Sequence, residues 1–126
     1  MRVLWLDDDT IPETVNIDGM QITKVQSCEQ AAERLQHFLP DWLLVDFIVP
    51  QEKWGNGLLY RVPGLRFIGE VKSLYDKNIR VAAYGRGVPA AWRKVARDNG
   101  AEQVFEKRAI AFHDVLTELR ALKETL

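Results

Sequence analysis

Four aspartates and one lysine of this 126-residue chain lie where they could form a metal-binding or catalytic site. Asp7, Asp8 and Asp9 directly follow one apolar run, and Asp46 directly follows another. Carboxylates that are packed together raise one another's pKa values unless a cation is present. Mg²⁺ takes oxygen ligands and keeps several waters, so a few carboxylates and a backbone carbonyl would suit it. Lys107 adds a charge that can pair with a carboxylate or a phosphoryl oxygen.

These residue types suit phosphoryl transfer. The carboxylate of Asp46 can act as a nucleophile toward phosphorus and form an aspartyl phosphate. The transition state spreads negative charge over the phosphoryl oxygens, which a metal ion and a lysine would neutralise. The two histidines, His37 and His113, fall in segments expected to be helical, and the sequence contains no obvious Ser-His-Asp or Cys-His arrangement. No glycine-rich turn follows the first apolar run, which argues against a dinucleotide-binding site.

The strands that would position these side chains are short. Residues 3–6, 42–45 and 81–84 are apolar runs that end abruptly at a polar residue or a glycine. Such runs predict strands that are buried on both faces, as in a parallel sheet covered by helices. Weaker alternating segments at 22–25 and 103–106 predict strands nearer the edges of the sheet.

Helices are predicted between these strands. Ser27 is a suitable N-cap, Gln30 completes a capping box, and Pro40 stops the helix that follows. Three further helices are predicted from helical spacing of apolar residues and from end signals: residues 65–75, 89–99 and 112–122. The alternation of strands and helices predicts an α/β fold with a doubly wound parallel sheet. First and third strands are neighbours in such a sheet, so their terminal acids would meet at one edge.

Two segments depart from the alternation. Residues 10–20 contain Pro12, Asn16 and Gly19 and favour a loop, with at most a weak helix. Residues 51–64 are rich in glycine and proline and predict a long loop after the third strand. Loops of this length are usually functional or mobile.

Composition predicts one ordinary globular domain over residues 1–126, with 47% apolar and 28% charged residues. The formal net charge of -1 gives no reason to expect direct binding to nucleic acid or to a membrane. Cys28 is the single cysteine, so an intrachain disulfide is impossible, and no zinc-binding spacing is present. Neither a signal peptide nor a membrane span is visible, so we expect a cytoplasmic protein.

Four segments resemble, in the same order, parts of the receiver domain of response regulators in two-component systems: VLWLDDD, DWLLVDFIVP, PGLRFIGEVKSL and NGAEQVFEKRA. The first resembles the family's first strand with its acidic pair, and the second resembles the phosphoacceptor segment, with Pro50 four residues after Asp46. The third matches a helix start with its glycine at Gly64, and the last matches the final strand with its lysine at Lys107. The resemblance implies a flavodoxin-like, five-stranded parallel sheet with strand order 2-1-3-4-5 and a first helix that is shortened or missing.

The resemblance also implies roles for individual residues. Asp7 and Asp8 match the acids that bind Mg²⁺, and Asp46 matches the phosphorylated aspartate. Ile48 matches the position whose backbone carbonyl ligates the metal, and Lys107 matches the lysine that contacts the phosphoryl group. The chain would be a phosphoacceptor and not an enzyme, apart from self-phosphorylation and slow autodephosphorylation. Its phosphoryl donor would be a histidine kinase or a histidine phosphotransfer protein, and its downstream partner another, unidentified protein.

The chain departs from the family where the conformational switch is expected. The usual threonine or serine that ends the fourth strand is replaced by Gly85, or by Ala82 in another alignment. Val104 stands at the position of the switch aromatic, next to Phe105, and Arg108 replaces a proline whose peptide bond is typically cis in the family.

The departures leave several interpretations open. Tyr84 or Arg86 could supply a substitute donor, although we rather expect Tyr84 to pack at the sheet edge with its hydroxyl in solvent. The chain could be a pseudo-receiver, an interaction module that phosphorylation does not switch. A metal-dependent phosphohydrolase is disfavoured, because Ile48 stands where such enzymes typically carry a second acid.

Two surfaces could contact other proteins. Trp54 and Tyr60 of the long loop could cover the phosphorylation site or meet a partner, or simply fold onto the domain. Trp92, Val95 and Phe112 could belong to a homodimer face formed by the fourth helix, fifth strand and fifth helix of the family, or could pack the core.

Overall fold

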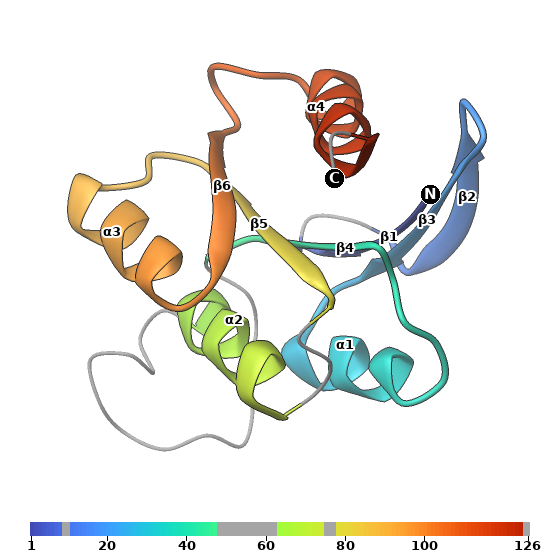
Figure 1. Cartoon of the computed structure of the whole chain (residues 1–126), viewed down its shortest axis with the longest axis horizontal. Helices are drawn as coiled ribbons and strands as arrows, with labels where there is room; N and C mark the ends of the chain where they lie inside the picture. The colour runs from blue at the N-terminus through green and yellow to red at the C-terminus, as the bar shows by residue number, and fades with distance from the viewer. Residues whose placement is uncertain (9–10, 48–62, 75–77, 125–126) are drawn as a thin grey trace.

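A computed structural model describes residues 1–8, 11–47, 63–74 and 78–124 of the chain. In these ranges helices cover both faces of a central sheet (Figure 1). The strands are β1 (Arg2–Leu6), β2 (Glu13–Ile17), β3 (Met20–Val25), β4 (Trp42–Val45), β5 (Arg80–Gly85) and β6 (Ala101–Glu106). The helices are α1 (Cys28–Leu35), α2 (Pro63–Leu74), α3 (Ala90–Asp98) and α4 (Phe112–Glu124).

The sheet has the order β2-β3-β1-β4-β5-β6. All neighbouring pairs are parallel except β2 and β3. Without β2, the remaining strands follow the predicted order 2-1-3-4-5, so the doubly wound, flavodoxin-like α/β fold is confirmed. The predicted number of five strands is wrong, because the structure has one additional antiparallel strand at the edge.

The additional strand comes from the segment that was expected to be a loop or a weak helix. Ile17 pairs with Met20, and the two residues between them, Asp18 and Gly19, both have positive φ angles, of 50° and 80°. Two-residue hairpin turns with positive φ at both positions match the right-handed twist of the strands, and Asp-Gly is a favoured sequence for them. The chain therefore enters β3 through a tight hairpin, with β2 in place of a first helix.

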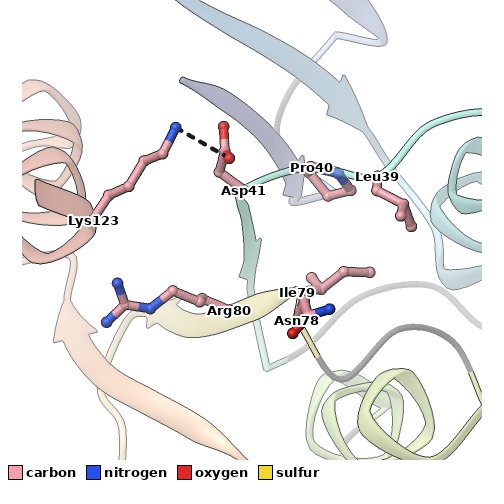
Figure 2. A pocket seen from close by; sticks show the side chains of 7 residues that line it. All are labelled: Leu39, Pro40, Asp41, Asn78, Ile79, Arg80 and Lys123. Carbon is pink, nitrogen blue, oxygen red and sulfur yellow. Dashed lines mark ion pairs between the residues drawn. The ribbon is translucent and has the colours of Figure 1, made fainter. Parts of the chain in front are cut away.

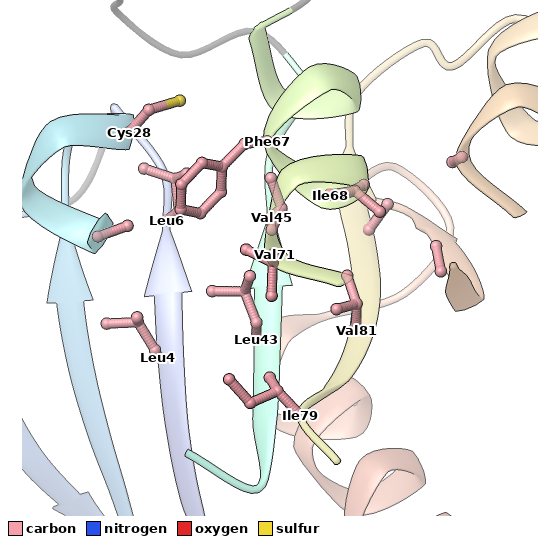
Figure 3. Packing of buried hydrophobic residues seen from close by; sticks show 14 of the residues in the cluster. Leu4, Leu6, Cys28, Leu43, Val45, Phe67, Ile68, Val71, Ile79 and Val81 are labelled. Carbon is pink, nitrogen blue, oxygen red and sulfur yellow. The ribbon is translucent and has the colours of Figure 1, made fainter. Parts of the chain in front are cut away.

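Each face of the sheet has its own core. Alternate residues of a strand point to opposite faces, so Leu43 and Val45 of β4 face α1 and α2, while Trp42 and Leu44 face α4. Figure 3 shows the first core, where Phe67 and neighbouring apolar residues of α2 pack onto β1, β4 and β5. β4 is buried along its whole length, which explains its uninterrupted apolar sequence.

On the second face, α4 lies alone among the described helices, and the hairpin of β2 and β3 stands beside it (Figure 1). Arg120 of α4 donates a hydrogen bond to the backbone carbonyl of Asp18 at 2.6 Å, and the ring of His113 lies 2.9 Å from the Asp18 carboxylate. Trp42 donates from its indole nitrogen to the carbonyl of Leu119 at 3.1 Å. The hairpin and α4 are thus bound to each other over a large separation in sequence.

The ends of the helices follow local chemistry. The side chain of Ser27 accepts a hydrogen bond from the backbone N–H of Gln30 at 3.2 Å, so the predicted N-cap is confirmed. The Gln30 side chain accepts from the backbone N–H of Gln26, one residue before the position that a standard capping box would use.

Within the described part of the chain, no helix has both the length and the apolarity needed to cross a bilayer.

The long loop is described only at its end. α2 begins at Pro63, so residues 63 and 64 are helical, contrary to the prediction. The rest of the predicted loop, with Ile48, Trp54 and Tyr60, lies outside the described residues.

Candidate functional site

The sheet brings the N-terminal acids next to Asp46. β1 and β4 are parallel neighbours, with Leu6 opposite Val45. The backbone N–H of Asp46 donates to the carbonyl of Leu6 at 2.9 Å, and that of Asp7 donates to Val25 at 3.0 Å. These bonds continue the sheet pairing by one residue beyond β1 and β4. They therefore fix the backbone positions of Asp7 and Asp46.

Three carboxylates converge at this edge. One oxygen each from Asp7, Asp8 and Asp46 lies within 4.8 Å of the other two. Asp7 and Asp46 are only 1% and 8% exposed, whereas Asp8 is exposed. Burying carboxylates is costly unless an opposite charge accompanies them. The donor set, carboxylate oxygens with one side open to solvent, fits a hard cation such as Mg²⁺.

Lys107 supplies a positive charge to this cluster. It follows β6, and its backbone N–H donates to the carbonyl of Gly85 at 2.9 Å. From there its ammonium group reaches over β5 and donates to Asp7 at 2.5 Å and to Asp46 at 3.0 Å. Burial alone would lower the pKa of Lys107, but its hydrogen bonds to the two aspartates outweigh this and raise the pKa above the ordinary value. The lysine therefore stays charged between the carboxylates.

Gly64 allows α2 to begin directly against the backbone of Asp46 and Phe47. Its backbone N–H donates to the carbonyl of Phe47 at 2.9 Å. A Cβ atom at Gly64 would lie 2.0 Å from the carbonyl oxygen of Asp46 and 2.7 Å from the Cα of Phe47. Since backbone atoms cannot move aside as a side chain can, only glycine fits here.

Phe47 explains the absence of a hydroxyl side chain at the end of β5. Gly85 lies at this strand end, whereas Ala82 is buried in the middle of β5 against the α4 side. A Cβ at Gly85 would lie 2.7 Å from Cδ2 of Phe47 and 3.3 Å from Cγ2 of Val88. The Phe47 ring, which is 2% exposed, occupies the space that a serine or threonine at Gly85 would need.

Tyr84 does not have its hydroxyl in solvent, so that expectation was wrong. The side chain is 5% exposed, and the hydroxyl donates to the backbone carbonyl of Ile110 at 2.9 Å. Burial raises the pKa of Tyr84. Because the hydroxyl is bonded to Ile110, it is not directed at the carboxylates as a substitute donor. Arg86 is exposed, and its suggested role stays a prediction.

The remaining switch positions are also built differently from the family pattern. Val104 is buried in the core on the α2 side, and Phe105 is half-buried on the α4 side. The peptide bond between Lys107 and Arg108 is trans, since the described residues contain no cis peptide bond.

Glu106 is a functional candidate that sequence analysis missed. Its carboxylate accepts hydrogen bonds from the backbone N–H of Gly87 at 2.7 Å and of Val88 at 3.4 Å, and from Arg108 at 2.7 Å. The bond from Gly87, followed by that from Arg108, lowers the pKa of Glu106. Glu106 thus fixes the backbone of the loop between β5 and α3. In the sequence, the one indication of such a role is that Glu106 directly precedes Lys107.

A cavity of about 280 Å³ lies where β4 and β5 begin, at the opposite end of the strands from the acids (Figure 2). Asp41, Arg80 and Lys123 are among its lining residues, and Asp41 and Lys123 form an ion pair at 3.2 Å. None of the converging acids lines this cavity, so it is a feature separate from the acidic site.

The fold is that of CheY-like receiver domains of response regulators. A receiver domain protein from Methanospirillum hungatei JF-1 aligns over 98% of this chain and 94% of its own, with a TM-score of 0.76 and 14% identity. The signal receiver domain of a DNA-binding response regulator from Colwellia psychrerythraea 34H aligns over 98% of both chains, with a TM-score of 0.72 and 18% identity.

The RcsB response regulator of Salmonella typhimurium has the same fold in part of its length. It aligns over 99% of this chain and 60% of its own, with a TM-score of 0.76 and 18% identity. By sequence, the chain matches no protein-family model and no curated protein.

Proposed function

We propose that the chain is a single receiver domain over residues 1–126 that accepts a phosphoryl group on Asp46. The observation that carries the proposal is the contact of one lysine with two acids that directly follow two neighbouring strands. Lys107 donates to both Asp7 and Asp46, and Asp8 completes a cluster of three carboxylates. These are the groups that phosphoryl transfer to an aspartate requires: a nucleophile, ligands for a cation and a fixed positive charge.

Asp7, Asp8 and Asp46 would hold Mg²⁺, together with the backbone carbonyl of Ile48, which lies outside the described residues. The buried carboxylates of Asp7 and Asp46 support this, because a divalent cation would offset their mutual repulsion. When bound, the ion supplies positive charge to the phosphoryl oxygens. Lys107 contributes a second positive charge from the side of β6.

The transfer step would need these residues, the cation that they hold and a phosphoryl donor. An oxygen of Asp46 forms a bond to phosphorus while the bond between phosphorus and the imidazole nitrogen of a donor phosphohistidine breaks, and the leaving nitrogen retains the electron pair. Lys107 stabilises the charge on the phosphoryl oxygens as this happens. Water later hydrolyses the acyl phosphate, which restores the Asp46 carboxylate and releases inorganic phosphate. The domain is therefore a phosphoacceptor, and the donor would be a histidine kinase or a histidine phosphotransfer protein.

Output would occur through contacts with another protein in the cytoplasm, without direct binding to nucleic acid or membrane. A homodimer through α3, β6 and α4 is part of the proposal. Trp92 and Val95 pack partly against the core on the α2 side, and Phe112 packs on the α4 side. Only their remaining exposed surface would be available to a second subunit.

Incubation with acetyl phosphate and Mg²⁺, followed by intact mass measurement, tests the proposal. Acetyl phosphate supplies the phosphoryl group, with acetate as the leaving group. We expect the mass of one phosphoryl group to be added to the wild type and to Asp41→Asn, a control at the opposite edge of the sheet. The adduct should be absent in Asp46→Ala. A wild type that stays unmodified at saturating donor and Mg²⁺ would contradict the proposal.

A second candidate function is an interaction module that phosphorylation does not switch. Phe47 fills the space beside Gly85, and Glu106 holds the neighbouring loop through Gly87 and Val88. Both features favour a fixed loop between β5 and α3. Hydrogen exchange of α3 with and without the adduct separates the two candidates: unchanged exchange after stoichiometric phosphorylation would favour the module.

A further inference from the structure

Tyr84 lies beside the ammonium group of Lys107. The ammonium nitrogen is 5.6 Å from the centre of the Tyr84 ring. A cation within about 6 Å of an aromatic ring centre, over its face, is attracted by the electrons of the ring. Tyr84 faces the α4 side of the sheet. Asp7 and Asp46 directly follow β1 and β4 and continue the alternation of Val3 and Trp5, and of Trp42 and Leu44, which face the same side. The ring therefore approaches Lys107 from within the protein.

The ring of Tyr84 is fixed from several directions. Its hydroxyl donates to the carbonyl of Ile110 at 2.9 Å, and its ring lies 6.2 Å from that of Phe112. Phe112 in turn stacks on Trp5 with a centroid distance of 4.0 Å. Trp5 lies on β1, two residues before Asp7, which follows the strand. The three rings thus connect β1 to the Tyr84 ring that contacts Lys107.

We propose that Tyr84 is a positioning residue for Lys107 in phosphoryl transfer to Asp46. A lysine side chain is long and flexible. Without a fixed contact, its ammonium group would spend part of the time in conformations that do not face the phosphoryl group. Two of its described contacts are the carboxylates of Asp7 and Asp46, which are also the groups that a divalent cation would attract. The Tyr84 ring is uncharged, so this contact stays available when the carboxylates are neutralised. The inference rests on the proposed function and adds a residue to it.

A purely structural role for Tyr84 makes a different prediction from a positioning role. Tyr84→Phe keeps the ring and removes the hydrogen bond to Ile110, whereas Tyr84→Leu removes the ring and keeps an apolar side chain. If the ring positions Lys107, the phenylalanine variant should recover the phosphorylation rate that the leucine variant loses. If Tyr84 acts only through its hydrogen bond, both variants should behave alike.

The experiment measures the initial rate of phosphorylation by acetyl phosphate at saturating Mg²⁺, by intact mass. We expect Tyr84→Leu to slow the reaction by about threefold to fivefold, the size of one cation–π contact. Tyr84→Phe should restore most of the wild-type rate. In the Lys107→Met background, Tyr84→Leu should cause no further slowing, because the group that it positions is absent. In a separate titration, the Mg²⁺ concentration that gives the half-maximal rate should be the same in the wild type and in the Tyr84 variants.

Two results would overturn the inference. One is an equal loss of rate in Tyr84→Phe and Tyr84→Leu; the other is the same factor from Tyr84→Leu with and without Lys107. If the wild type accepts no phosphoryl group at all, the proposed function fails instead. The contact is then tested by urea unfolding of the same four proteins, namely wild type, Tyr84→Leu, Lys107→Met and the double variant. Non-additive midpoints would support the contact between Tyr84 and Lys107, and additive midpoints would refute it.

Discussion

The packing of Phe47 against Gly85 predicts that a methyl group at position 85 is harmful only while the ring is present. Gly85→Ala places a Cβ 2.7 Å from the Phe47 ring and 3.3 Å from Val88. Phe47 is 2% exposed and lies 6.1 Å, centre to centre, from the Trp92 ring, so it cannot turn away freely. Gly85 does not have a positive φ, so the cost comes from space and not from backbone strain.

The magnitude follows from two opposing effects. Overpacking of a filled core costs about 1–3 kcal/mol, and replacing glycine by alanine in a strand returns roughly 0.5–1 kcal/mol. We therefore expect Gly85→Ala to lower the free energy of unfolding by about 1–2 kcal/mol. In a Phe47→Ala background, which itself costs about 3–5 kcal/mol, the shortest contact of the new methyl group is absent and only that with Val88 remains. Gly85→Ala should then be neutral or stabilising by up to about 1 kcal/mol.

Urea unfolding of the wild type, both single variants and the double variant measures this coupling. Gly69→Ala is a matched control, because its Cβ would meet the end of the Asn99 side chain at 3.0 Å, and a side chain can shift. We expect the control to be near neutral. The reasoning is refuted if Gly85→Ala changes stability equally with and without the Phe47 ring, or if it stabilises the wild type.

Three further predictions concern other parts of the structure. Gly64→Ala should destabilise the fold by about 3 kcal/mol and impair phosphorylation of Asp46, because the methyl group meets backbone atoms. Urea unfolding measures the stability and intact mass measures the phosphorylation. A variant that is as stable and as readily phosphorylated as the wild type would contradict this. Cys28 is buried, and burial raises its pKa to about 12; its thiol should therefore resist a disulfide reagent in native protein at neutral pH and react once urea unfolds the chain, whereas rapid native labelling would count against this. Arg80, through its hydrogen bonds, lowers the pKa of Glu102 below 4.5; the stabilisation is present above about pH 4.5 and lost as the pH falls through the folded-state value. Glu102→Gln should cost about 0.5 kcal/mol at pH 7, allowing for solvent screening, and unfolding curves of the two proteins should converge in acid; a constant difference would argue against the pair.

The central strands could be predicted from local sequence, and the meeting of the acids followed from the order of strands expected for the fold. A strand buried on both faces must be apolar throughout, as β4 is. Once β1 and β4 are parallel neighbours, the residues that follow them necessarily share an edge. Ser27 was also recognisable, because its hydroxyl serves a helix that begins at the next residue.

β2 was missed because it is an edge strand with exposed and half-buried side chains, so its hydrophobic pattern is weak. The turn at Asp18 and Gly19 was the stronger signal and was overlooked. The contact of Phe47 with Gly85 could not be predicted by pattern, since it depends on ångström-scale placement of two strand ends. The bonds of Glu106 to Gly87 and Val88 likewise depend on a loop conformation that sequence alone does not specify.

The attachment of the hairpin turn to α4 has a consequence for the nascent chain during synthesis. Asp18 is bound by His113 and Arg120, which are 95 and 102 positions further along the sequence. Until those residues have left the ribosome, the turn lacks its anchor and the apolar side chains of Ile22 and Trp42 lack the helix that shelters them. Contacts of such long range slow folding, and exposed apolar surface attracts aggregation. The N-terminal half therefore cannot complete its packing on the α4 side of the sheet until the C-terminal helix has been made.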